Sequence, residues 1–237
     1  MLSIILPCYN EQDNLEFLFN SLDPVAAAHQ DLEIILVNNG STDNSVAVFE
    51  QELAKRNRNI FRVVTVEKNI GYGYGILTGL RAAKGDILSV THADRQTDPM
   101  DVLKAFKIYQ DQSSTLALVK GFRKNRRPME AFFSWGMGLL SSLALGTRLT
   151  EINAQPKLFS KAFFDSIEQD APHDFSLDLY FLYHAKNKGQ IIDFPVYFAK
   201  RVAGEAKGGS GSSWKVRWKL IKRILNYIFE LRKKVKQ

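Results

Sequence analysis

Polar side chains that could hold a metal ion directly follow an apolar run near the middle of the chain. The run covers residues 87–91, and after it come His92, Asp94, Gln96 and Asp98. If the backbone stays extended, residues 92, 94 and 96 share one face. Hard oxygen ligands just past the C-terminal end of a parallel strand are what a divalent cation needs when it holds a diphosphate. The segment therefore predicts a nucleotide-sugar site.

Two earlier apolar segments also end in polar loops. Residues 2–6 predict a strand that breaks into the first loop, and residues 32–37 predict a second strand. Asn-Asn-Gly-Ser-Thr-Asp follows at 38–43, where Ser41 or Thr42 can cap a helix. Each strand therefore leads into a loop of the kind that contacts a ligand.

A glycine-rich segment completes this half of the chain. Lys-Asn-Ile-Gly-Tyr-Gly-Tyr-Gly at 68–75 leads into a helix predicted over 76–84, and Gly-Asp then opens the strand at 87–91. Strands that alternate with helices indicate a parallel sheet whose ligand crevice lies at the carboxyl ends of the strands.

Together, four motifs resemble the family 2 glycosyltransferases. They are Pro-Cys-Tyr-Asn-Glu at 7–11, Val-Asn-Asn-Gly-Ser-Thr-Asp at 37–43, the Lys-Asn-Ile-Gly helix start at 68–71 and the Asp-x-Asp region at 92–94. The resemblance implies an α/β fold of the GT-A (Rossmann-like) type, with a mixed, mostly parallel sheet and helices on both faces. It also implies a metal-assisted, inverting transfer of a sugar from a nucleotide-sugar donor, UDP- or GDP-linked.

The same resemblance implies a metal site and a donor site. Asp94 matches the metal-binding Asp, and Gln96 matches a Gln that completes the site. His92 stands where the family has its first Asp. Mg²⁺ or Mn²⁺ is therefore expected at these three residues. Gly71 and Gly73 would let the backbone approach the donor. The residues expected at the donor are Pro7, Tyr9, Glu11, Asn38, Asn39, Lys68, Gly71, His92 and Ala93.

The second half is similar to the polyprenyl-phosphate sugar synthases. A helix is predicted over 99–110 and a strand over 115–121, followed by a basic run at 122–128. A loop and strand at 152–159, a helix at 175–189 and a strand at 190–198 come next. Arg-x-x-Gly-Glu-x-Lys then stands at 201–207. In that group, basic residues that match Arg123, Arg201 and Lys207 grip the phosphate of the acceptor, and the resemblance extends over roughly residues 2–210.

The acceptor decides whether a base is needed. A polyprenyl phosphate is already anionic, so the three cations would only have to align it. A hydroxyl on a glycan or glycolipid would need a carboxylate to take its proton, and Asp174 or Asp178 is then the candidate.

Two segments predict contact with a membrane surface. Residues 131–146 are uncharged and suit either a core helix or one in the membrane interface. Residues 214–237 carry nine Lys/Arg and one Glu, whereas the remaining chain holds 23 basic and 24 acidic residues. Apolar side chains recur there at helical spacing: Trp214, Trp218, Ile221, Leu225, Ile228 and Leu231.

A basic amphipathic helix with Trp at one end is typical of anionic membrane surfaces. A helix docked on its own domain and an oligomer contact are the alternatives. We expect a GT-A domain over 1–210 and this helical tail over 211–237, with the Gly/Ser run at 208–213 as a linker or an active-site flap.

Composition narrows the remaining choices. The single cysteine excludes an intramolecular disulfide, and no signal peptide or membrane span is evident, so we expect a cytoplasmic protein attached peripherally to the inner face of the membrane. The neutral charge of the body argues against a nucleic-acid partner. The alternatives to transfer onto polyprenyl phosphate are transfer onto a sugar hydroxyl and a non-catalytic nucleotide-sugar-binding protein.

Overall fold

A computed structural model describes residues 1–94, 96–112, 117–126, 128–199 and 214–235, with the side chains of the last helix described over 222–233. The described residues form one seven-stranded sheet in the order β3-β2-β1-β4-β6-β5-β7. The strands are β1 (Leu2–Cys8), β2 (Leu32–Asn39), β3 (Phe61–Val66), β4 (Ile87–Val90), β5 (Leu118–Lys124), β6 (Lys157–Ser160) and β7 (Ile191–Tyr197). The helices are α1 (Gln12–Ala28), α2 (Ser45–Ala54), α3 (Tyr72–Ala82), α4 (Asp101–Gln110), α5 (Pro128–Leu145), α6 (Lys161–Asp165), η1 (Glu168–Asp170), α7 (Leu177–Lys188) and α8 (Trp214–Val235).

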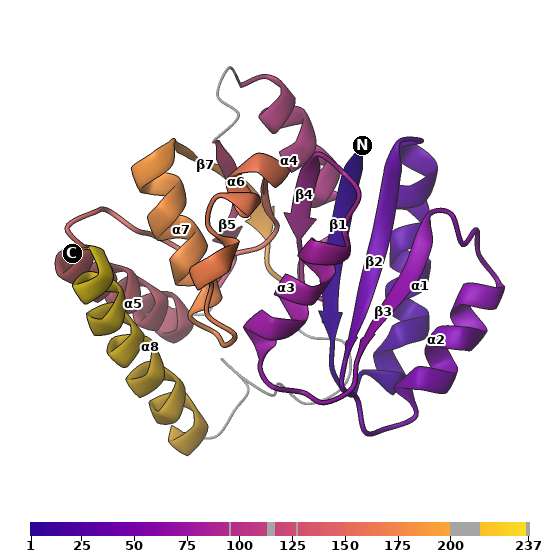
Figure 1. Cartoon of the computed structure of the whole chain (residues 1–237), viewed down its shortest axis with the longest axis horizontal. Helices are drawn as coiled ribbons and strands as arrows, with labels where there is room; N and C mark the ends of the chain where they lie inside the picture. The colour runs from indigo at the N-terminus through magenta and orange to yellow at the C-terminus, as the bar shows by residue number, and fades with distance from the viewer. Residues whose placement is uncertain (95, 113–116, 127, 200–213, 236–237) are drawn as a thin grey trace.

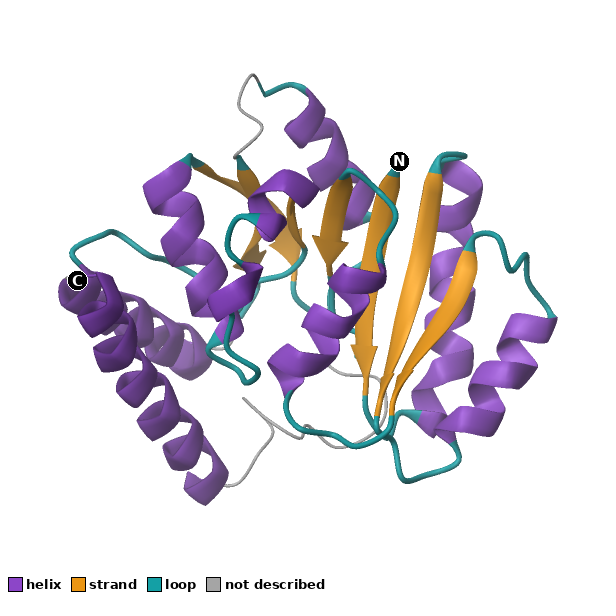
Figure 2. Cartoon of the chain, in the orientation of Figure 1, coloured by secondary structure: helices purple, strands orange, loops and turns teal. Residues whose placement is uncertain are grey.

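The sheet is mixed and mostly parallel, as predicted. Only β6 runs antiparallel to its neighbours β4 and β5, while β7 returns parallel to β5. Helices cover both faces (Figure 2), because side chains of β1 alternate between two apolar cores. Ile5 points into a core with α3 and α7, whereas Ile4 and Leu6 point into another with α1 and α4.

The parallel strands β1 to β4 end at one edge of the sheet (Figure 1). The polar loops that follow them therefore meet there, which is where ligands bind in open parallel sheets. Several boundaries differ from prediction, among them that of β5, which covers Leu118–Lys124 rather than 115–121. β1 runs through Pro7, which pairs with Val37, and α3 begins at Tyr72 rather than at residue 76. The early start is possible because the glycines of the first turn allow close packing against neighbouring segments.

The tail helix α8 is docked on its own domain over the part whose side chains are described. Ile224, Ile228 and Leu231 are buried in the core that also holds α7, and α8 packs along α5 (Figure 1). Ile228 and Leu231 therefore face the core and not a membrane, so the predicted membrane contact of these two residues is wrong. The amphipathic pattern could not distinguish the two cases, because a docked helix and a surface-lying helix share the same periodicity. The domain boundary near residue 210 stays a prediction, since 200–213 lie outside the described residues.

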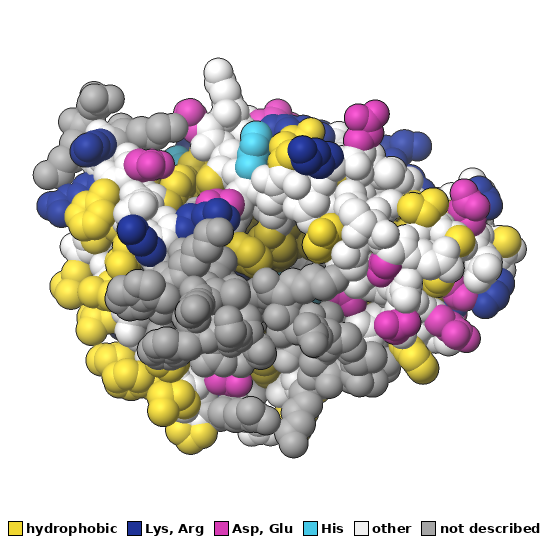
Figure 3. All heavy atoms as spheres, turned by 90° about the horizontal axis from the view of Figure 1, so that it is seen from below, with side chains coloured by type: hydrophobic (Ala, Val, Ile, Leu, Met, Phe, Trp, Pro, Cys, Tyr) yellow, Lys and Arg dark blue, Asp and Glu magenta, His cyan; other side chains and the backbone are white. Residues whose placement is uncertain are grey.

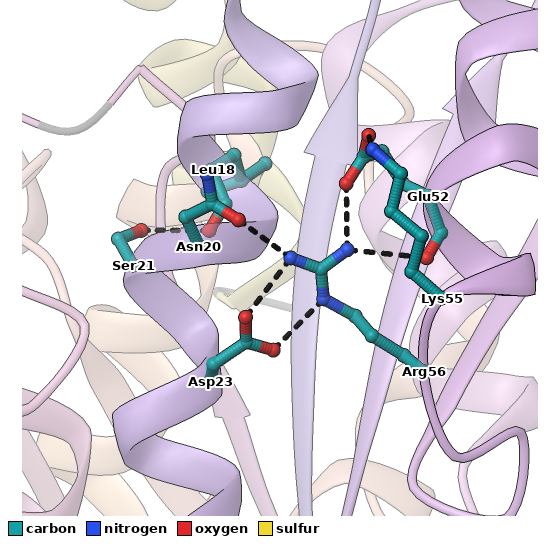
Figure 4. A network of polar contacts seen from close by, with 7 residues as sticks. All are labelled: Leu18, Asn20, Ser21, Asp23, Glu52, Lys55 and Arg56. Atoms are coloured by element: carbon teal, nitrogen blue, oxygen red, sulfur yellow. Dashed lines mark hydrogen bonds and ion pairs between the residues drawn. The ribbon is translucent and has the colours of Figure 1, made fainter.

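Arg56 clamps α1 to α2 and so holds the two helices behind the first polar loops. Its guanidinium donates to both carboxylate oxygens of Asp23, at 2.8 and 2.9 Å, and to Glu52 Oε2 at 2.6 Å (Figure 4). Its carbon Cζ lies 4.9 Å from the ring centroid of Phe19. Removing the cation would leave the buried carboxylate of Glu52 with only the exposed Lys55 as a partner.

We expect Arg56→Ala to lower the free energy of unfolding by about 2–3 kcal/mol, because breaking a largely buried ion pair leaves a charge uncompensated. Urea unfolding of the purified protein measures this. Arg58→Ala, at an exposed position two residues on, is the matched control and should change stability by less than about 0.5 kcal/mol. Equal effects of the two substitutions would show that the clamp adds nothing.

Candidate active site

The loops after β1 and β2 are tied together by side-chain hydrogen bonds. Asn10, with φ of 52°, accepts at Oδ1 from the backbone of Thr42 at 2.7 Å, and its own N–H donates to Ser41 Oγ at 3.0 Å. The Glu11 N–H donates to Ser45 Oγ at 3.1 Å. Ser41 and Thr42 therefore brace the first loop. The prediction that one of them caps α2 is wrong, because the N-cap residue is Asn44 and Asp43 Oδ1 accepts from the Ser45 N–H at 3.0 Å. The predicted donor residues Pro7, Tyr9 and Glu11 lie half-buried along this edge.

The Asn38-Asn39 pair is turned inward. Both side chains are buried, and Asn38 Oδ1 accepts from the Ser41 N–H at 3.1 Å, which shapes the turn. Asn39 Nδ2 donates to the Gly71 carbonyl at 3.0 Å and so fixes the start of α3. Asn39 Oδ1 is buried and makes no hydrogen bond within the described residues. The pair thus shapes the edge of the sheet at which the nucleotide-sugar donor is expected. Its predicted contact with the donor stays a prediction.

The glycines at the start of α3 pack closely against the backbone of the 172–174 loop. A Cβ on Gly71, where φ is 148°, would lie 2.1 Å from the His173 carbonyl oxygen, and one on Gly73 would lie 2.6 Å from that of Asp174. The Tyr74 N–H donates to the same His173 carbonyl at 2.9 Å. Close approach to the 172–174 loop therefore requires these glycines, and their predicted approach to the donor stays a prediction. Lys68, just before them, is exposed.

The predicted metal-binding loop is bent rather than extended. β4 ends at Val90, and Asp94 Oδ1 accepts from the Gln96 N–H at 3.1 Å. The same-face argument for residues 92, 94 and 96 therefore fails, because no pleat continues through them. Gln96 is fixed to the segment just after β7 by two hydrogen bonds. Its side-chain Nε2 donates to the Ala199 carbonyl at 3.3 Å, and its backbone carbonyl accepts from the Ala199 N–H at 2.8 Å. Ala93 is buried beneath the loop.

The candidate metal ligands in this loop fit one kind of metal site. Within the described ranges, no three His, Cys, Asp or Glu side chains converge as a metal cage. One carboxylate (Asp94), an amide (Gln96) and an imidazole (His92) stand in the loop, and Mg²⁺ is commonly held by one or two carboxylates with substrate phosphates supplying further oxygens. The loop thus fits a cation that arrives with a diphosphate.

Tyr72 connects this loop to the rest of the site. Its ring stacks on Phe175 with centroids 4.8 Å apart and lies 6.5 Å from the His92 ring. Burial raises the pKa of Tyr72 well above its ordinary value, and the carboxylates of Asp178 and Asp94 raise it further.

Asp178 is committed to a buried ion pair. Lys157 Nζ lies 2.6 Å from Asp178 Oδ1, Gln155 Nε2 donates to the same oxygen at 3.1 Å, and both charged side chains are at most 5% exposed. Burial lowers the pKa of Lys157, Asp178 opposes that shift, and the nearby cations Lys120 and Arg123 add to it. Asp178 thus serves as a counter-ion. The other candidate base, Asp174, accepts from the Ser176 N–H and pairs with Arg223 at 3.4 Å.

Two arginines meet one carboxylate at the C-terminal end of β5. Arg123 Nε donates to Glu151 Oε2 at 2.7 Å, and Arg126 Nη1 donates to Glu151 Oε1 at 3.0 Å. Arg126 Nη2 also donates to Ser134 Oγ at 2.9 Å and to the Glu130 carbonyl at 3.0 Å. Arg201 and Lys207, the other predicted cations, lie outside the described residues.

The strand register places these arginines on the same side of the sheet edge as the predicted metal-binding loop. Lys157 of β6 pairs with Val90 at the end of β4 on one side and with Lys120 of β5 on the other. Neighbouring strands are about 4.8 Å apart, so Lys120 lies about 10 Å across the sheet from the start of the loop. Arg123 follows three residues further along the same strand. The basic run at 122–128 signalled the arginines, but no sequence pattern signalled Glu151 or Lys157.

An apolar surface begins at the same arginines. In α5 only Gly138 and Ser141 are fully buried, while Met137, Ala144 and Leu145 are partly buried against the core, so the segment is a surface helix with one face packed on the domain rather than a core helix. Figure 3 shows hydrophobic side chains gathered at the edge of the molecule where Figure 1 draws α5 and α8. We call the exposed set the α5 ridge: Met129, Phe132, Phe133, Trp135, Leu139, Leu140 and Leu143. No helix of the described chain is both long and apolar enough to span a bilayer.

The family follows from a direct comparison. The family model described as "Glycosyl transferase family 2" matches residues 3–167, well over half of the chain. The chain belongs to this family. The motif-based prediction is thus confirmed, and the matched residues include the loops after β1, β2 and β4 as well as Arg123, Arg126 and Glu151.

Two curated relatives extend the likeness of this family 2 chain. It is 25% identical over 209 residues to the undecaprenyl-phosphate 4-deoxy-4-formamido-L-arabinose transferase of Pseudomonas fluorescens (strain SBW25), covering 86% of this chain and 59% of the relative. It is 26% identical over 238 residues to the dolichol-phosphate mannosyltransferase of Pyrococcus furiosus, covering 98% and 63%. The chain therefore spans about three fifths of the length of these relatives.

A solved structure shows the same fold. Glucosyl-3-phosphoglycerate synthase from Mycobacterium tuberculosis, crystallised with Mn²⁺, UDP and glucosyl-3-phosphoglycerate, superposes with a TM-score of 0.74 at 18% identity, covering 98% of this chain and 79% of that one. The GT-A-like fold predicted for this family 2 chain is therefore confirmed.

Proposed function

We propose that this chain transfers a sugar from a nucleotide-sugar donor to a polyprenyl phosphate. The observation that carries the proposal is the pair Arg123 and Arg126, held by one carboxylate beside the predicted metal-binding loop. Guanidinium groups recognise phosphate oxygens in the way they bind carboxylates, so this site suits an acceptor phosphate. The names of the two curated relatives, each a transferase acting on a polyprenyl phosphate, support the same acceptor class.

The state of the carboxylates favours a phosphate acceptor over a hydroxyl. A hydroxyl would need a general base, yet Asp178 is buried in its ion pair with Lys157, and Asp174 pairs with Arg223. A phosphate acceptor needs no such base. Its oxygen forms a bond to the anomeric carbon of the donor sugar, and the bond from that carbon to the diphosphate breaks, with the electron pair leaving on the nucleotide.

The donor would bind at the edge formed by the loops after β1, β2 and β4. Asp94, Gln96 and His92 are the residues that would hold Mg²⁺ or Mn²⁺ there, and the bound ion would supply a Lewis acid for the departing diphosphate. The uridine or guanosine base would lie against the half-buried Pro7 and Tyr9. Lys68, which is exposed near this edge, would approach the donor phosphates.

The lipid part of the acceptor would follow the α5 ridge to a membrane surface. Arg126 binds Ser134 and the Glu130 carbonyl within the first turns of α5, so a phosphate at the arginines would lie at the start of the ridge. A continuous row of exposed aromatic and aliphatic side chains is typical of surfaces that bind lipid or protein. We therefore propose peripheral attachment to the inner face of a membrane through α5, rather than through the buried face of α8.

The experiment is a comparison of acceptor kinetics. Arg123→Gln is expected to raise the KM for a short-chain polyprenyl phosphate by about tenfold or more, because one charge-assisted hydrogen bond to phosphate is lost, while the KM for the donor stays within about twofold. Lys124→Gln removes an exposed cation one residue away and is the matched control. If the donor KM rises instead, or if both variants behave alike, the arginine is not part of an acceptor site.

A further inference from the structure

The carboxylate of Glu151 accepts hydrogen bonds from both arginines of the proposed acceptor site. Each of its carboxylate oxygens accepts from a different arginine, Arg123 at 2.7 Å and Arg126 at 3.0 Å. The three side chains are between 8% and 13% exposed. Glu151 thus bridges the two guanidinium groups as an oxyanion ligand would, and a phosphate that binds them must displace it.

Backbone strain lies on both sides of this contact. Glu151 has φ of 47°, and Asn125, between the two arginines, has φ of 58°. Left-handed conformations are uncommon for residues with a side chain, and they persist where the surrounding structure imposes them, often at ligand sites. The carboxylate is therefore held on the arginines from a strained loop, which lowers the cost of releasing it.

Unused donor atoms around the contact leave room for further acceptor oxygens. Four cations and four carboxylates gather here. The cations are Lys120, Arg123, Arg126 and Lys157, and the carboxylates are Glu130, Glu151, Asp178 and Asp193. Arg126 Nε is buried without a hydrogen-bond partner in the described chain. Lys120 Nζ lies 2.8 Å from Asp193 Oδ1 but lacks the geometry of a hydrogen bond. A ligand with more acceptor oxygens than a carboxylate could thus use donor atoms that Glu151 leaves without a hydrogen bond.

We propose that Glu151 is a specificity-determining competitor that admits the dianionic acceptor and expels the monoanionic product. This rests on the proposed function. A phosphate monoester carries a charge of about −1.5 to −2 at neutral pH, whereas the phosphodiester formed by sugar transfer carries a single negative charge. The monoester outcompetes the Glu151 carboxylate for the arginines. The diester, with no more charge than that carboxylate, is displaced when Glu151 returns.

The test measures binding without turnover. Isothermal titration compares a short prenyl phosphate with its methyl diester, for the full chain and for Glu151→Gln, in the absence of donor. The wild-type protein should bind the monoester at least about tenfold more tightly than the diester. Glu151→Gln should tighten the diester most and so reduce this ratio by about tenfold. Glu130→Gln removes a nearby carboxylate whose charge also acts on Arg126 but which makes no hydrogen bond to either arginine in the described chain; it is the control and should change the ratio by less than about twofold.

The possible results of the titration test the role of Glu151 and the proposed acceptor class separately. Binding of both ligands with the same ratio in wild type and Glu151→Gln would overturn the inference alone. Weaker binding of both ligands by Glu151→Gln, with an unchanged Tm, would also overturn it, because the carboxylate would then be orienting the arginines rather than competing. Failure of either protein to bind the monoester would overturn the proposed acceptor class and the inference with it.

Discussion

Replacing Asp94 with asparagine is expected to lower sugar transfer by at least about a hundredfold while leaving the fold intact. The amide keeps an oxygen that can accept from the Gln96 N–H, so the bend of the loop survives. The substitution removes the only carboxylate among the three proposed metal ligands. Charge stabilisation by a catalytic metal is worth several kcal/mol, and each 1.4 kcal/mol is a factor of ten in rate.

Two readouts check this prediction. Initial rates as a function of Mn²⁺ concentration should show a higher half-saturating concentration for Asp94→Asn, and circular dichroism should show an unchanged Tm within a few degrees. Asp98→Asn is the matched control, because Asp98 is an exposed carboxylate in the same loop that accepts from the Met100 N–H. If Asp94→Asn retains most of the activity with the same metal dependence, the predicted metal site is wrong.

Replacing Asp178 with asparagine is expected to destabilise the protein by about 3–5 kcal/mol, because the Lys157 ammonium would remain buried without a counter-ion. The double substitution Lys157→Met, Asp178→Leu removes both charges and should recover most of that loss, since apolar pairs often replace buried ion pairs without cost. Urea unfolding of the single and double variants measures the difference.

The same pair changes how activity data at Asp178 must be interpreted. From the sequence, loss of turnover in Asp178→Asn would have indicated a base for a hydroxyl acceptor. In the structure the residue is a buried counter-ion, so lost turnover could follow from lost stability alone. Activity of the stable double variant decides: retained transfer excludes a base at Asp178, and a stable but inactive double variant would favour one. A single variant as stable as wild type would contradict the ion-pair argument.

The sequence predicted those parts of the fold that are specified locally. The strands at 2–6, 32–37 and 87–91 were recognisable because parallel strands buried on both faces read as continuous apolar runs, and the polar residues after them marked the ligand edge. The family motifs lie in these same loops, so the position of Asp94 followed with them. The observed sheet and the family match confirm the predicted strands and family, and the role of Asp94 stays a prediction.

Contacts between distant segments could not be predicted in this way. Glu151 meets Arg123 from 28 residues away, and no local pattern marks a glutamate that turns back onto a basic strand. The role of Asn39 was likewise hidden, because its bond to the Gly71 carbonyl joins two loops that are neighbours only in the folded sheet. The burial of α8 was ambiguous for a different reason: one apolar stripe suits a protein core and a membrane surface equally.

The most direct test is label transfer by the full chain from a panel of radiolabelled UDP- and GDP-sugars, with Mg²⁺ or Mn²⁺, to polyprenyl phosphate in anionic vesicles. Parallel vesicles carry the corresponding polyprenol. The account predicts that label enters the organic phase only with the phosphate acceptor, and that Arg123→Gln reduces this transfer. Transfer to the polyprenol at a comparable rate, or donor binding with no transfer to the lipid phosphate under either metal, would contradict it.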